Sequence, residues 1–227
     1  MKKAIVLLSG GIDSTTSLYL AKKKGFEGFC LIFDYGQRHK REIESAKRIA
    51  SLARCKYQVL KIDLPWKGSS LLDRRKDIPS STHHTALKIP STYVPARNII
   101  FLSFALSWAE TIGAEAIFIG AHAQDYSGYP DCRPEFYQAF RKIMTTGTRM
   151  GIEGRFIKIL TPLIDRTKAQ IIKLARQLRV PFELTWSCYR GGRFPCGRCP
   201  SCYFRAKGFK EAGIIDPLIK NRDRHHF

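Results

Sequence analysis

Hydrophobic residues recur along the chain both in short runs and at helical spacing, and the two patterns alternate. Residues 4–8 are an unbroken apolar run that ends at a Ser-Gly-Gly sequence, which is typical of a strand buried on both faces of a parallel sheet. The apolar positions that follow predict a helix that begins near Asp13 or Ser14 and ends at Gly25. The start of the chain therefore predicts a strand, a tight turn and a helix.

The same alternation continues through the rest of the chain. Further strands are expected at residues 29–33, 57–62, 115–120 and 156–160, and further helices at residues 38–54, 96–112, 134–145 and from 167 onward. Strands that alternate with helices form a parallel, doubly wound sheet, so the predicted fold class is α/β. Ligands of such folds bind beyond the carboxyl ends of the strands, which is where we expect the site.

Three segments differ from the others in length or composition. Residues 63–93 form a long loop rich in proline, serine and charge, which is typical of a functional lid or a mobile segment. Residues 96–112 are apolar around much of the helix, which predicts burial against the sheet or against a second subunit, so a homodimer is expected. Residues 120–133 are polar and rich in turns, and they follow the fourth strand, where a substrate pocket is expected.

The turn after the first strand carries the residues of an anion site. Gly10 and Gly11 have no side chain, so their backbone N–H groups can close on an anion. The start of the following helix adds its dipole, and further hydroxyl donors are Ser9, Ser14 and Thr15. The sequence matches neither the Walker nor the Rossmann phosphate loop. It resembles the S-G-G-x-D-S loop of the PP-loop ATP pyrophosphatases, which bind ATP by its pyrophosphate and transfer AMP to an acceptor.

A second helix start points to the same kind of ligand. Thr167 and Gln170 have the spacing of a capping box, which fixes the first turn of a helix. Lys168 lies in that first turn, where its positive charge opposes the helix dipole. An anionic partner for Lys168 is therefore expected.

Four of the seven cysteines lie close together near the C-terminus. Their spacing is C-x7-C-x2-C-x2-C, made by Cys188, Cys196, Cys199 and Cys202. Gaps of two residues let thiolates from one turn reach a common ion, and four sulfurs close a tetrahedral zinc site with no open position, which indicates a structural metal. An iron–sulfur cluster is the alternative, and zinc is favoured because nothing in the sequence points to a redox partner.

The composition fits one main domain with a small appendage. The chain has 227 residues, of which 44% are hydrophobic and 26% charged, enough to bury a core. We expect a nucleotide-binding α/β domain over residues 1–180, with the 63–93 loop inserted, and a zinc-binding subdomain over residues 181–227. No apolar run has the length of a membrane span and no signal sequence is recognisable, so a cytoplasmic location without a membrane partner is expected.

The net charge of +20 raises the question of a nucleic-acid partner. The basic residues are scattered along the chain, and no aromatic residues lie between them to form a stacking platform. A basic exterior around phosphate-bearing small substrates is therefore favoured over an RNA-binding surface, and no nucleic-acid partner is expected.

Taken together, these motifs resemble the 7-cyano-7-deazaguanine synthase family, and the similarity spans nearly the whole chain. The matching blocks are residues 8–14, 34–39, 93–98, 125–136 and 185–188, with the three later cysteines. The resemblance implies an ATP-dependent ligase that converts 7-carboxy-7-deazaguanine and ammonia to 7-cyano-7-deazaguanine through adenylated intermediates, for queuosine and archaeosine biosynthesis. It also implies a doubly wound sheet with the first strand at its centre.

The resemblance further implies roles for individual residues. ATP is expected to bind to the first loop and helix, formed by Leu8, Ser9, Gly10, Gly11, Ile12, Asp13, Ser14, Thr15, Thr16, Ser17 and Leu18. Asp13 is expected to contact Mg²⁺. As catalytic residues beside Asp13, Arg97 and Lys168 are expected to neutralise phosphate charge. The deazaguanine is expected to be surrounded by Asp125, Ser127, Tyr129, Asp131 and Arg133. Cys132 is not expected to act as a nucleophile.

Three other functions remain open at this stage. A PP-loop tRNA sulfurtransferase would also adenylate its substrate and would explain the basic charge, but neither a catalytic cysteine pair nor an RNA-binding appendage is recognisable. A non-enzymatic zinc-ribbon RNA-binding protein would bind RNA with a steep salt dependence and release no AMP. An amide-forming relative of the synthases would stop halfway along the same reaction.

Overall fold

The fold is a five-stranded parallel sheet covered by helices on both faces. The computed structural model describes residues 1–80, 89–122 and 128–219. The strands are β1 (Lys2–Leu7), β2 (Phe26–Asp34), β3 (Lys56–Lys61), β4 (Ala116–Phe118) and β5 (Lys158–Leu160). Their order across the sheet is β3-β2-β1-β4-β5, so the expected α/β class and the central place of β1 are confirmed.

The apolar run at the start of the chain explains why β1 is central. Val6 pairs with Cys30 of β2 on one side and with Phe118 of β4 on the other. Residues Ala4, Ile5 and Val6 are fully buried, as expected for a strand that is covered on both faces. Because all neighbours are parallel, the residues that follow β1, β2 and β4 meet at one edge of the sheet.

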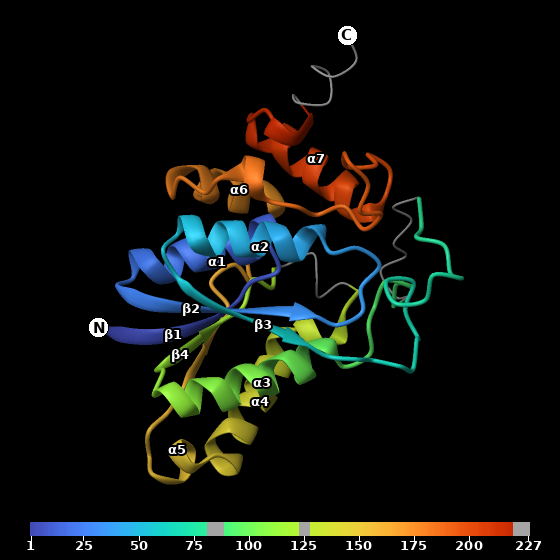
Figure 1. Ribbon diagram of the computed structural model, residues 1–227. Helices are drawn as coiled ribbons and strands as arrows, with labels where there is room; N and C mark the ends of the chain where they lie inside the picture. The colour runs from blue at the N-terminus through green and yellow to red at the C-terminus, as the bar shows by residue number, and fades with distance from the viewer. Residues whose placement is uncertain (81–88, 123–127, 220–227) are drawn as a thin grey trace.

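Two layers of helices enclose the sheet (Figure 1). On one face lie α1 (Ile12–Lys23) and α2 (Arg41–Leu52), and on the other lie α3 (Arg97–Ile112), α4 (Pro134–Gly147) and the short α5 (Arg149–Ile152). In α2 the buried residues are Ile43, Ala46, Ile49 and Ala50, the spacing of one apolar helix face. Each face of the sheet thus has its own hydrophobic cluster against its own helices.

The C-terminal part adds a third layer on top of α1 and α2. It contains α6 (Lys168–Gln177), the short 3₁₀ helix η2 (Phe182–Leu184) and α7 (Pro200–Ala212). A second short 3₁₀ helix, η1 (Pro130–Cys132), directly precedes α4. Ile171 and Ile172 of α6 share one hydrophobic cluster with Phe209 of α7. This cluster includes residues on both sides of position 180, and the division into domains at that position stays a prediction.

Helix α3 is less completely buried than its apolar sequence suggests. Leu102 and Ala105 are fully buried against the sheet, whereas Ile99 is 44% exposed and Phe104 is 41% exposed. The described residues of the loop at 63–93 form neither helix nor strand, as expected. In the described part of the chain, no helix combines the length and apolarity that crossing a membrane requires.

Candidate active site

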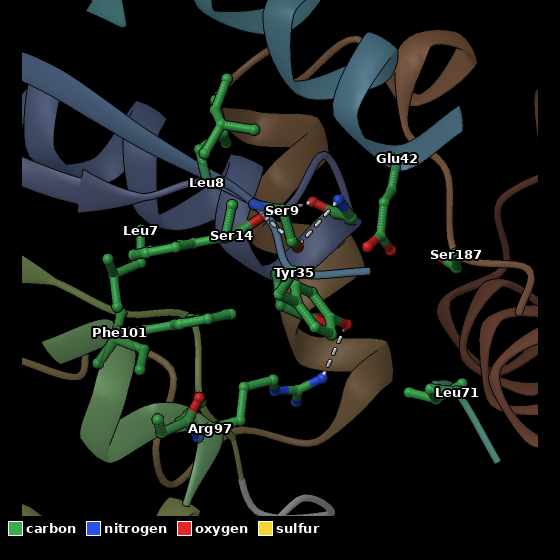
Figure 2. A pocket seen from close by; sticks show the side chains of 18 of the residues that line it. Leu7, Leu8, Ser9, Ser14, Tyr35, Glu42, Leu71, Arg97, Phe101 and Ser187 are labelled. Carbon is green, nitrogen blue, oxygen red and sulfur yellow. Dashed lines mark hydrogen bonds between the residues drawn. The ribbon is translucent and has the colours of Figure 1, made fainter. Parts of the chain in front are cut away.

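A cavity of about 280 Å³ lies at the carboxyl edge of the sheet. Its walls come from the turn after β1, the ends of β2 and β4, the first turns of α2 and α3, and the segment before the cysteine cluster. Figure 2 shows Ser9, Ser14, Tyr35, Glu42 and Arg97 around this space. The site therefore lies where parallel α/β sheets bind ligands.

The turn after β1 is held tightly against its neighbours. Gly10 has φ +81°, and a Cβ there would overlap the carbonyl oxygen of Glu42 and lie 2.8 Å from the backbone nitrogen of Ala46. The carbonyl oxygen of Gly10 accepts a hydrogen bond of 2.9 Å from the backbone nitrogen of Trp186. Glycine is required here for both its conformation and its lack of a side chain.

Polar groups of this turn face the cavity. The hydroxyls of Ser9 and Ser14 lie 3.0 Å apart, and the backbone nitrogen of Gly11 donates to the Ser9 hydroxyl at 3.3 Å. The backbone nitrogen of Ser9 donates to the Ser14 hydroxyl at 3.2 Å. These donors lie at the N-terminus of α1, whose dipole favours an anion, so the turn can bind phosphate.

The second half of the predicted ATP segment faces the core rather than the cavity. Thr15 and Thr16 are fully buried, and their hydroxyls each donate a hydrogen bond of 2.7 Å to a carbonyl one helical turn earlier, on Gly11 and Ile12. Ser17 and Leu18 are also fully buried. The expected segment residues that line the cavity are Leu8, Ser9, Gly11, Asp13 and Ser14.

Asp13 and Lys168, both expected in the site, form an ion pair beside the turn. The Nζ atom of Lys168 lies 2.7 Å from both carboxylate oxygens of Asp13 and 3.1 Å from Nε2 of His122. Burial alone would raise the pKa of the Asp13 carboxyl, but Lys168 and His122 hold it well below its ordinary value. Asp13 is therefore ionised. Lys168 is not among the residues that line the cavity, and it is connected to the cavity wall through Asp13.

Helix α7 makes room for this lysine. A Cβ at Gly208 would overlap the side chain of Lys168 and lie 2.9 Å from Cδ1 of Ile172. Sequence reasoning did not identify His122 or Gly208, which both contact Lys168. The position of His122 just after the fourth strand is a signal that could have identified it.

The opposite wall carries Arg97, Tyr35 and Glu42. Arg97 is the first residue of α3, and its Nη1 donates a hydrogen bond of 3.3 Å to the hydroxyl of Tyr35. Burial raises the pKa of Tyr35 to about 12, so its hydroxyl stays protonated. The Glu42 carboxylate accepts a hydrogen bond of 2.9 Å from Nε2 of Gln37. Glu42 and Tyr35 belong to the site but had no role in the sequence-based prediction.

Of the residues expected around the deazaguanine, only some of the described ones line the cavity. Asp125 and Ser127 lie outside the described residues. Tyr129 lines the cavity, and its hydroxyl lies 2.7 Å from the hydroxyl of Thr92. Asp131 is buried, and its Oδ2 accepts a hydrogen bond of 2.9 Å from the backbone nitrogen of Asn98 in the first turn of α3. Arg133 is exposed and is not among the residues that line the cavity.

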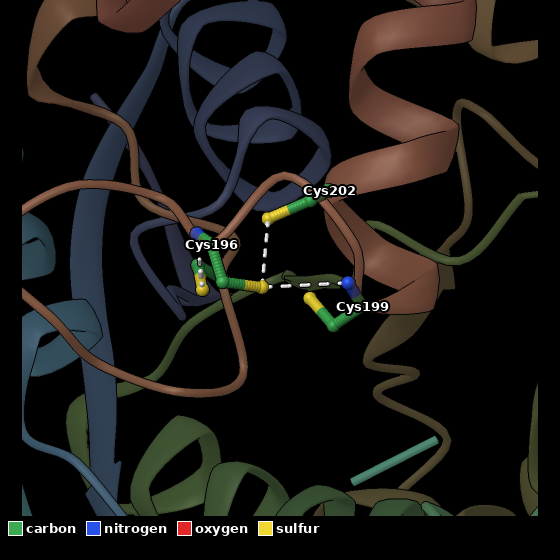
Figure 3. Close-up of side chains that lie close together, drawn as sticks. Cys196, Cys199 and Cys202 are labelled. Atoms are coloured by element: carbon green, nitrogen blue, oxygen red, sulfur yellow. Dashed lines mark hydrogen bonds between the residues drawn. The ribbon is translucent and has the colours of Figure 1, made fainter. Parts of the chain in front are cut away.

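The four clustered cysteines converge on one point (Figure 3). Their sulfur atoms all lie within 4.8 Å of one another, and the Sγ atoms of Cys196 and Cys202 are 3.9 Å apart. Sulfurs that share a tetrahedral zinc ion at the usual bond length are about 3.8 Å apart. Backbone nitrogens of Arg190 and Cys196 point at the sulfur of Cys188, at 3.4 and 3.3 Å. All seven cysteines of the chain are free thiols, and the four in the cluster, Cys188, Cys196, Cys199 and Cys202, fit a zinc site.

The cysteine cluster is connected to the cavity through Trp186. The indole nitrogen of Trp186 donates to the carbonyl of Cys188 at 3.0 Å, while its backbone nitrogen donates to Gly10. The guanidinium of Arg41 stacks on the Trp186 ring, 4.5 Å from its centre. The segment around Trp186 thus connects the cysteine cluster, helix α2 and the turn after β1, which is called the glycine turn below.

Known proteins resemble this chain along nearly its whole length. The family model for the queuosine biosynthesis protein QueC matches residues 3–213. The 7-cyano-7-deazaguanine synthase of Acetivibrio thermocellus is 53% identical over 219 residues, which is 96% of this chain and 97% of that protein. The synthase of Nostoc punctiforme is 51% identical over 221 residues, or 96% and 99% of the two chains.

A solved structure shares the fold at much lower identity. The NMN synthetase from Francisella tularensis matches with a TM-score of 0.50 and 15% identity, over 99% of this chain and 85% of that one. This likeness supports the α/β architecture and carries no information on the substrate.

Proposed function

The chain belongs to the queuosine biosynthesis protein QueC family, and from this premise we propose that it makes 7-cyano-7-deazaguanine from 7-carboxy-7-deazaguanine, ammonia and ATP. The carboxylate is activated by adenylation and ammonia converts it to an amide. The amide is activated by a second ATP and loses the elements of water to give the nitrile. The observation that carries the proposal is the Ser-Gly-Gly turn, which opens into the cavity in a chain that is 53% identical to a named synthase.

The turn after β1 is proposed to bind the pyrophosphate of ATP. Ser9, Gly11 and Ser14 place hydroxyl and backbone N–H groups at the positive end of α1, where they bond to one another in the structure and would turn to a bound phosphate. A carboxylate is a poor electrophile, and adenylation turns one of its oxygens into a good leaving group. Adenylyl transfer needs position and charge neutralisation more than covalent help from the protein, which suits a turn made of neutral donors.

Lys168 and Arg97 are proposed to neutralise charge on the two sides of this turn. Lys168 is held by Asp13 at 2.7 Å and offers a point charge, whereas Arg97 projects a planar fork from the start of α3. Asp13 is a candidate ligand of Mg²⁺, which prefers carboxylate and phosphate oxygens and would neutralise phosphate charge when bound. Lys168 would hold the carboxylate of Asp13 in place for this role.

The apolar part of the cavity is proposed to hold the deazapurine. Phe101 and Tyr129 contribute flat side chains to its walls, on which a fused ring can stack. Tyr129 was expected there from the sequence. The other proposed contacts of the substrate are Asp125, Ser127, Asp131 and Arg133. In the structure, the carboxylate of Asp131 accepts a hydrogen bond from the backbone nitrogen of Asn98 in the first turn of α3.

The cysteine cluster is proposed to hold a structural zinc ion. Four sulfur ligands, Cys188, Cys196, Cys199 and Cys202, leave no open position for a substrate. A bound zinc ion would fix the segment that contacts Gly10 through Trp186. We propose that its contribution to the reaction is this support of the turn.

The oligomeric state, the location and the role of the positive charge are proposed from exposed side chains and from composition. The exposed side chains of Ile99 and Phe104 on α3 suit a homodimer contact, which light scattering of the wild type and of Phe104→Glu would test. Free thiols throughout the chain suit the proposed cytoplasmic location. The charge of +20 is proposed to serve anionic small substrates rather than a nucleic acid.

One experiment separates the synthase from the other functions. Purified protein is incubated with ATP, ammonium and 7-carboxy-7-deazaguanine, and the deazapurine and nucleotide products are identified by mass spectrometry. The synthase yields the nitrile and AMP, an amide-forming relative stops at the amide, and a sulfurtransferase or an RNA-binding protein leaves the deazapurine unchanged. The variant Asp13→Ala is the control, because it removes the anchor of Lys168 and is expected to abolish turnover in folded protein.

A further inference from the structure

We propose that Glu42 is the catalytic base of the reaction, the group that removes protons from the nitrogen atom as ammonia becomes first an amide and then a nitrile. The proposal rests on the synthase function proposed above and adds to it the residue that handles the nitrogen. Glu42 lies in the first turn of α2 and lines the cavity. Figure 2 shows its carboxylate directed into the space between the glycine turn and Tyr35.

The chemistry requires such a base. When ammonia attacks the acyl-adenylate, a C–N bond forms, the C–O bond to AMP breaks, and nitrogen loses one proton. When the amide is activated, its oxygen bonds to the α-phosphorus of the second ATP, pyrophosphate leaves, and nitrogen loses a second proton. When the nitrile forms, the last N–H electron pair enters the C–N bond, AMP leaves with the oxygen, and nitrogen loses a third proton.

The position of Glu42 is fixed on two sides. Its carbonyl oxygen packs against Gly10, so the backbone of Glu42 is set directly against the proposed pyrophosphate turn. One carboxylate oxygen accepts from Nε2 of Gln37 at 2.9 Å, and Oε1 of Gln37 accepts from the backbone nitrogen of Tyr35 at 2.8 Å. Among the residues that the structure describes, none makes a hydrogen bond to the other carboxylate oxygen, Oε2. That oxygen is therefore available to a substrate in the cavity.

The surroundings of Glu42 match the task of a base at neutral pH. Burial raises the pKa of Glu42 to about 7, although the charge of Arg97 and the hydrogen bond from Gln37 both lower it. Within the described part of the chain, the groups that interact with the Glu42 carboxylate are Arg97 from α3 and, from the segment after β2, Gln37 and the protonated hydroxyl of Tyr35. A base is most effective when its pKa lies near the working pH.

The other described carboxylates near the cavity are poorly suited to this role. Lys168 and His122 keep the pKa of Asp13 well below its ordinary value, so Asp13 is a weak base. The carboxylate of Asp131 accepts from the backbone of Asn98 and is buried. Glu42 therefore combines access, position and basicity.

The test uses the conversion of the amide to the nitrile. This step consumes no ammonia, so its pH dependence does not include the protonation of ammonia to ammonium. The 7-amido-7-deazaguanine and ATP are mixed with excess enzyme, and the single-turnover rate of nitrile formation is measured across pH. For the wild type this rate is expected to rise with pH through about 7. For Glu42→Gln it is expected to fall by roughly 10²- to 10⁴-fold and to lose that rise.

Three controls make the result specific. Glu44→Gln changes an exposed carboxylate on the same helix, which pairs with Lys47 at 2.9 Å, and its rate is expected to stay at the wild-type value. Exchange of pyrophosphate into ATP in the presence of the carboxylate substrate needs no loss of an N–H proton and is expected to persist in Glu42→Gln. Glu42→Asp retains a carboxylate one methylene further back, so a reduced rate that still rises with pH is expected.

The proposal is overturned if Glu42→Gln forms nitrile at the wild-type rate or keeps the rise with pH. It is also overturned if exchange and nitrile formation are lost together while the variant is folded, because Glu42 would then position substrate instead of accepting protons. If Glu42→Gln does not fold, the proposal is overturned by a Glu42→Asp rate that is independent of pH. A wild type that makes no nitrile would instead contradict the proposed function itself.

Discussion

Gly10 is the residue on which the geometry of the site depends most directly. Its positive φ and its contact with the Glu42 carbonyl leave no room for a side chain. Its carbonyl oxygen also receives the hydrogen bond from Trp186. A single residue thus connects the glycine turn, α2 and the segment before the cysteine cluster.

We expect Gly10→Ala to deform this turn. Alanine at positive φ costs about 1 to 2 kcal/mol, and the overlap of its Cβ with the backbone of α2 adds to that cost. The free energy of unfolding, measured by urea denaturation, should fall by about 2 kcal/mol or more, and ATP affinity should fall as well. Gly36→Ala is a matched control, because Gly36 also has positive φ but nothing lies within 4 Å of its added Cβ. Equal ATP binding by the wild type and Gly10→Ala would contradict this account of the turn.

Glu42 should make stability depend on pH. Its pKa is about 7 in the folded protein and about 4.3 in an unfolded chain, so between these values the unfolded state binds fewer protons than the folded state. The contribution of Glu42 to the free energy of unfolding is therefore fully present below about pH 4.3 and is lost as pH rises through about 7. Above that pH, Glu42 causes no further change in stability. Urea denaturation across pH should show this fall in the wild type and not in Glu42→Gln. Parallel curves for the two proteins would show that the pKa of Glu42 is not raised.

At the residue scale, the sequence predicted those site residues that belong to a short local motif. The Ser-Gly-Gly turn and Asp13 carry a recognisable pattern, and both line the cavity. The inward orientation of Thr15 and Thr16 was missed because hydroxyls in a helix can bond to the preceding turn, and the sequence alone does not show which way they face. Glu42 was missed because burial raises its pKa, and that burial comes from the packing of the folded chain, which the local sequence does not show.

At the scale of elements, α7 determines the position of parts of the site that lie far from it in sequence. Gly208 leaves space for the side chain of Lys168, and Arg205 reaches the segment before Trp186. Arg205 is buried and forms a two-point ion pair with Asp216 at 2.6 and 2.9 Å, and it also donates to Thr185. Helix α7 therefore supports both Lys168 and the segment that contacts Gly10.

Removal of this ion pair should destabilise the C-terminal layer. Arg205→Ala leaves Asp216 buried without its partner, so a loss of about 3 to 5 kcal/mol in the free energy of unfolding is expected. Lys207→Ala is the control, because Lys207 is half-exposed and pairs with Glu211 only at 3.8 Å. A loss in Arg205→Ala no larger than in the control would indicate that the pair does not hold α7 in place.

The elements themselves were predicted well where periodicity was strong. Strands β1 and β2 and helices α3 and α4 lie within a few residues of the expected ranges. Strand β4 is shorter than expected, because the chain leaves the sheet before Gly120, which packs against the backbone of Asp13 and Ser14. Helix α7 was not expected, since Pro200, Cys202 and Gly208 obscure its helical pattern.

At the scale of the whole molecule, the cysteine cluster and the cavity form one connected structure. The segment from Trp186 to Cys202 contacts the glycine turn at one end and begins α7 at the other. A metal in the cluster would therefore influence nucleotide binding without touching the nucleotide. The spacing of the four cysteines predicted that their sulfurs converge, but not this connection, which depends on the packing of distant segments.

Removal of the zinc ion proposed for the cysteine cluster should test this connection. After treatment with a strong chelator, with metal content checked by elemental analysis, far-ultraviolet circular dichroism should retain most of the signal, because the sheet and its own helices have separate cores. ATP affinity should fall, because the contact of Trp186 with Gly10 loses its support. Unchanged ATP affinity in fully metal-free protein would disprove the coupling, and visible absorbance from the purified protein would favour an iron–sulfur cluster.

The central claim is that the turn after β1 is a nucleotide site. Titration calorimetry of ATP into folded, magnesium-supplied protein tests this claim most directly, because it requires no knowledge of the second substrate. The account predicts saturable binding at one site per chain, weakened in Gly10→Ala and retained in Gly36→Ala. Absence of ATP binding by the folded wild-type protein would contradict the claim and every role assigned to the cavity.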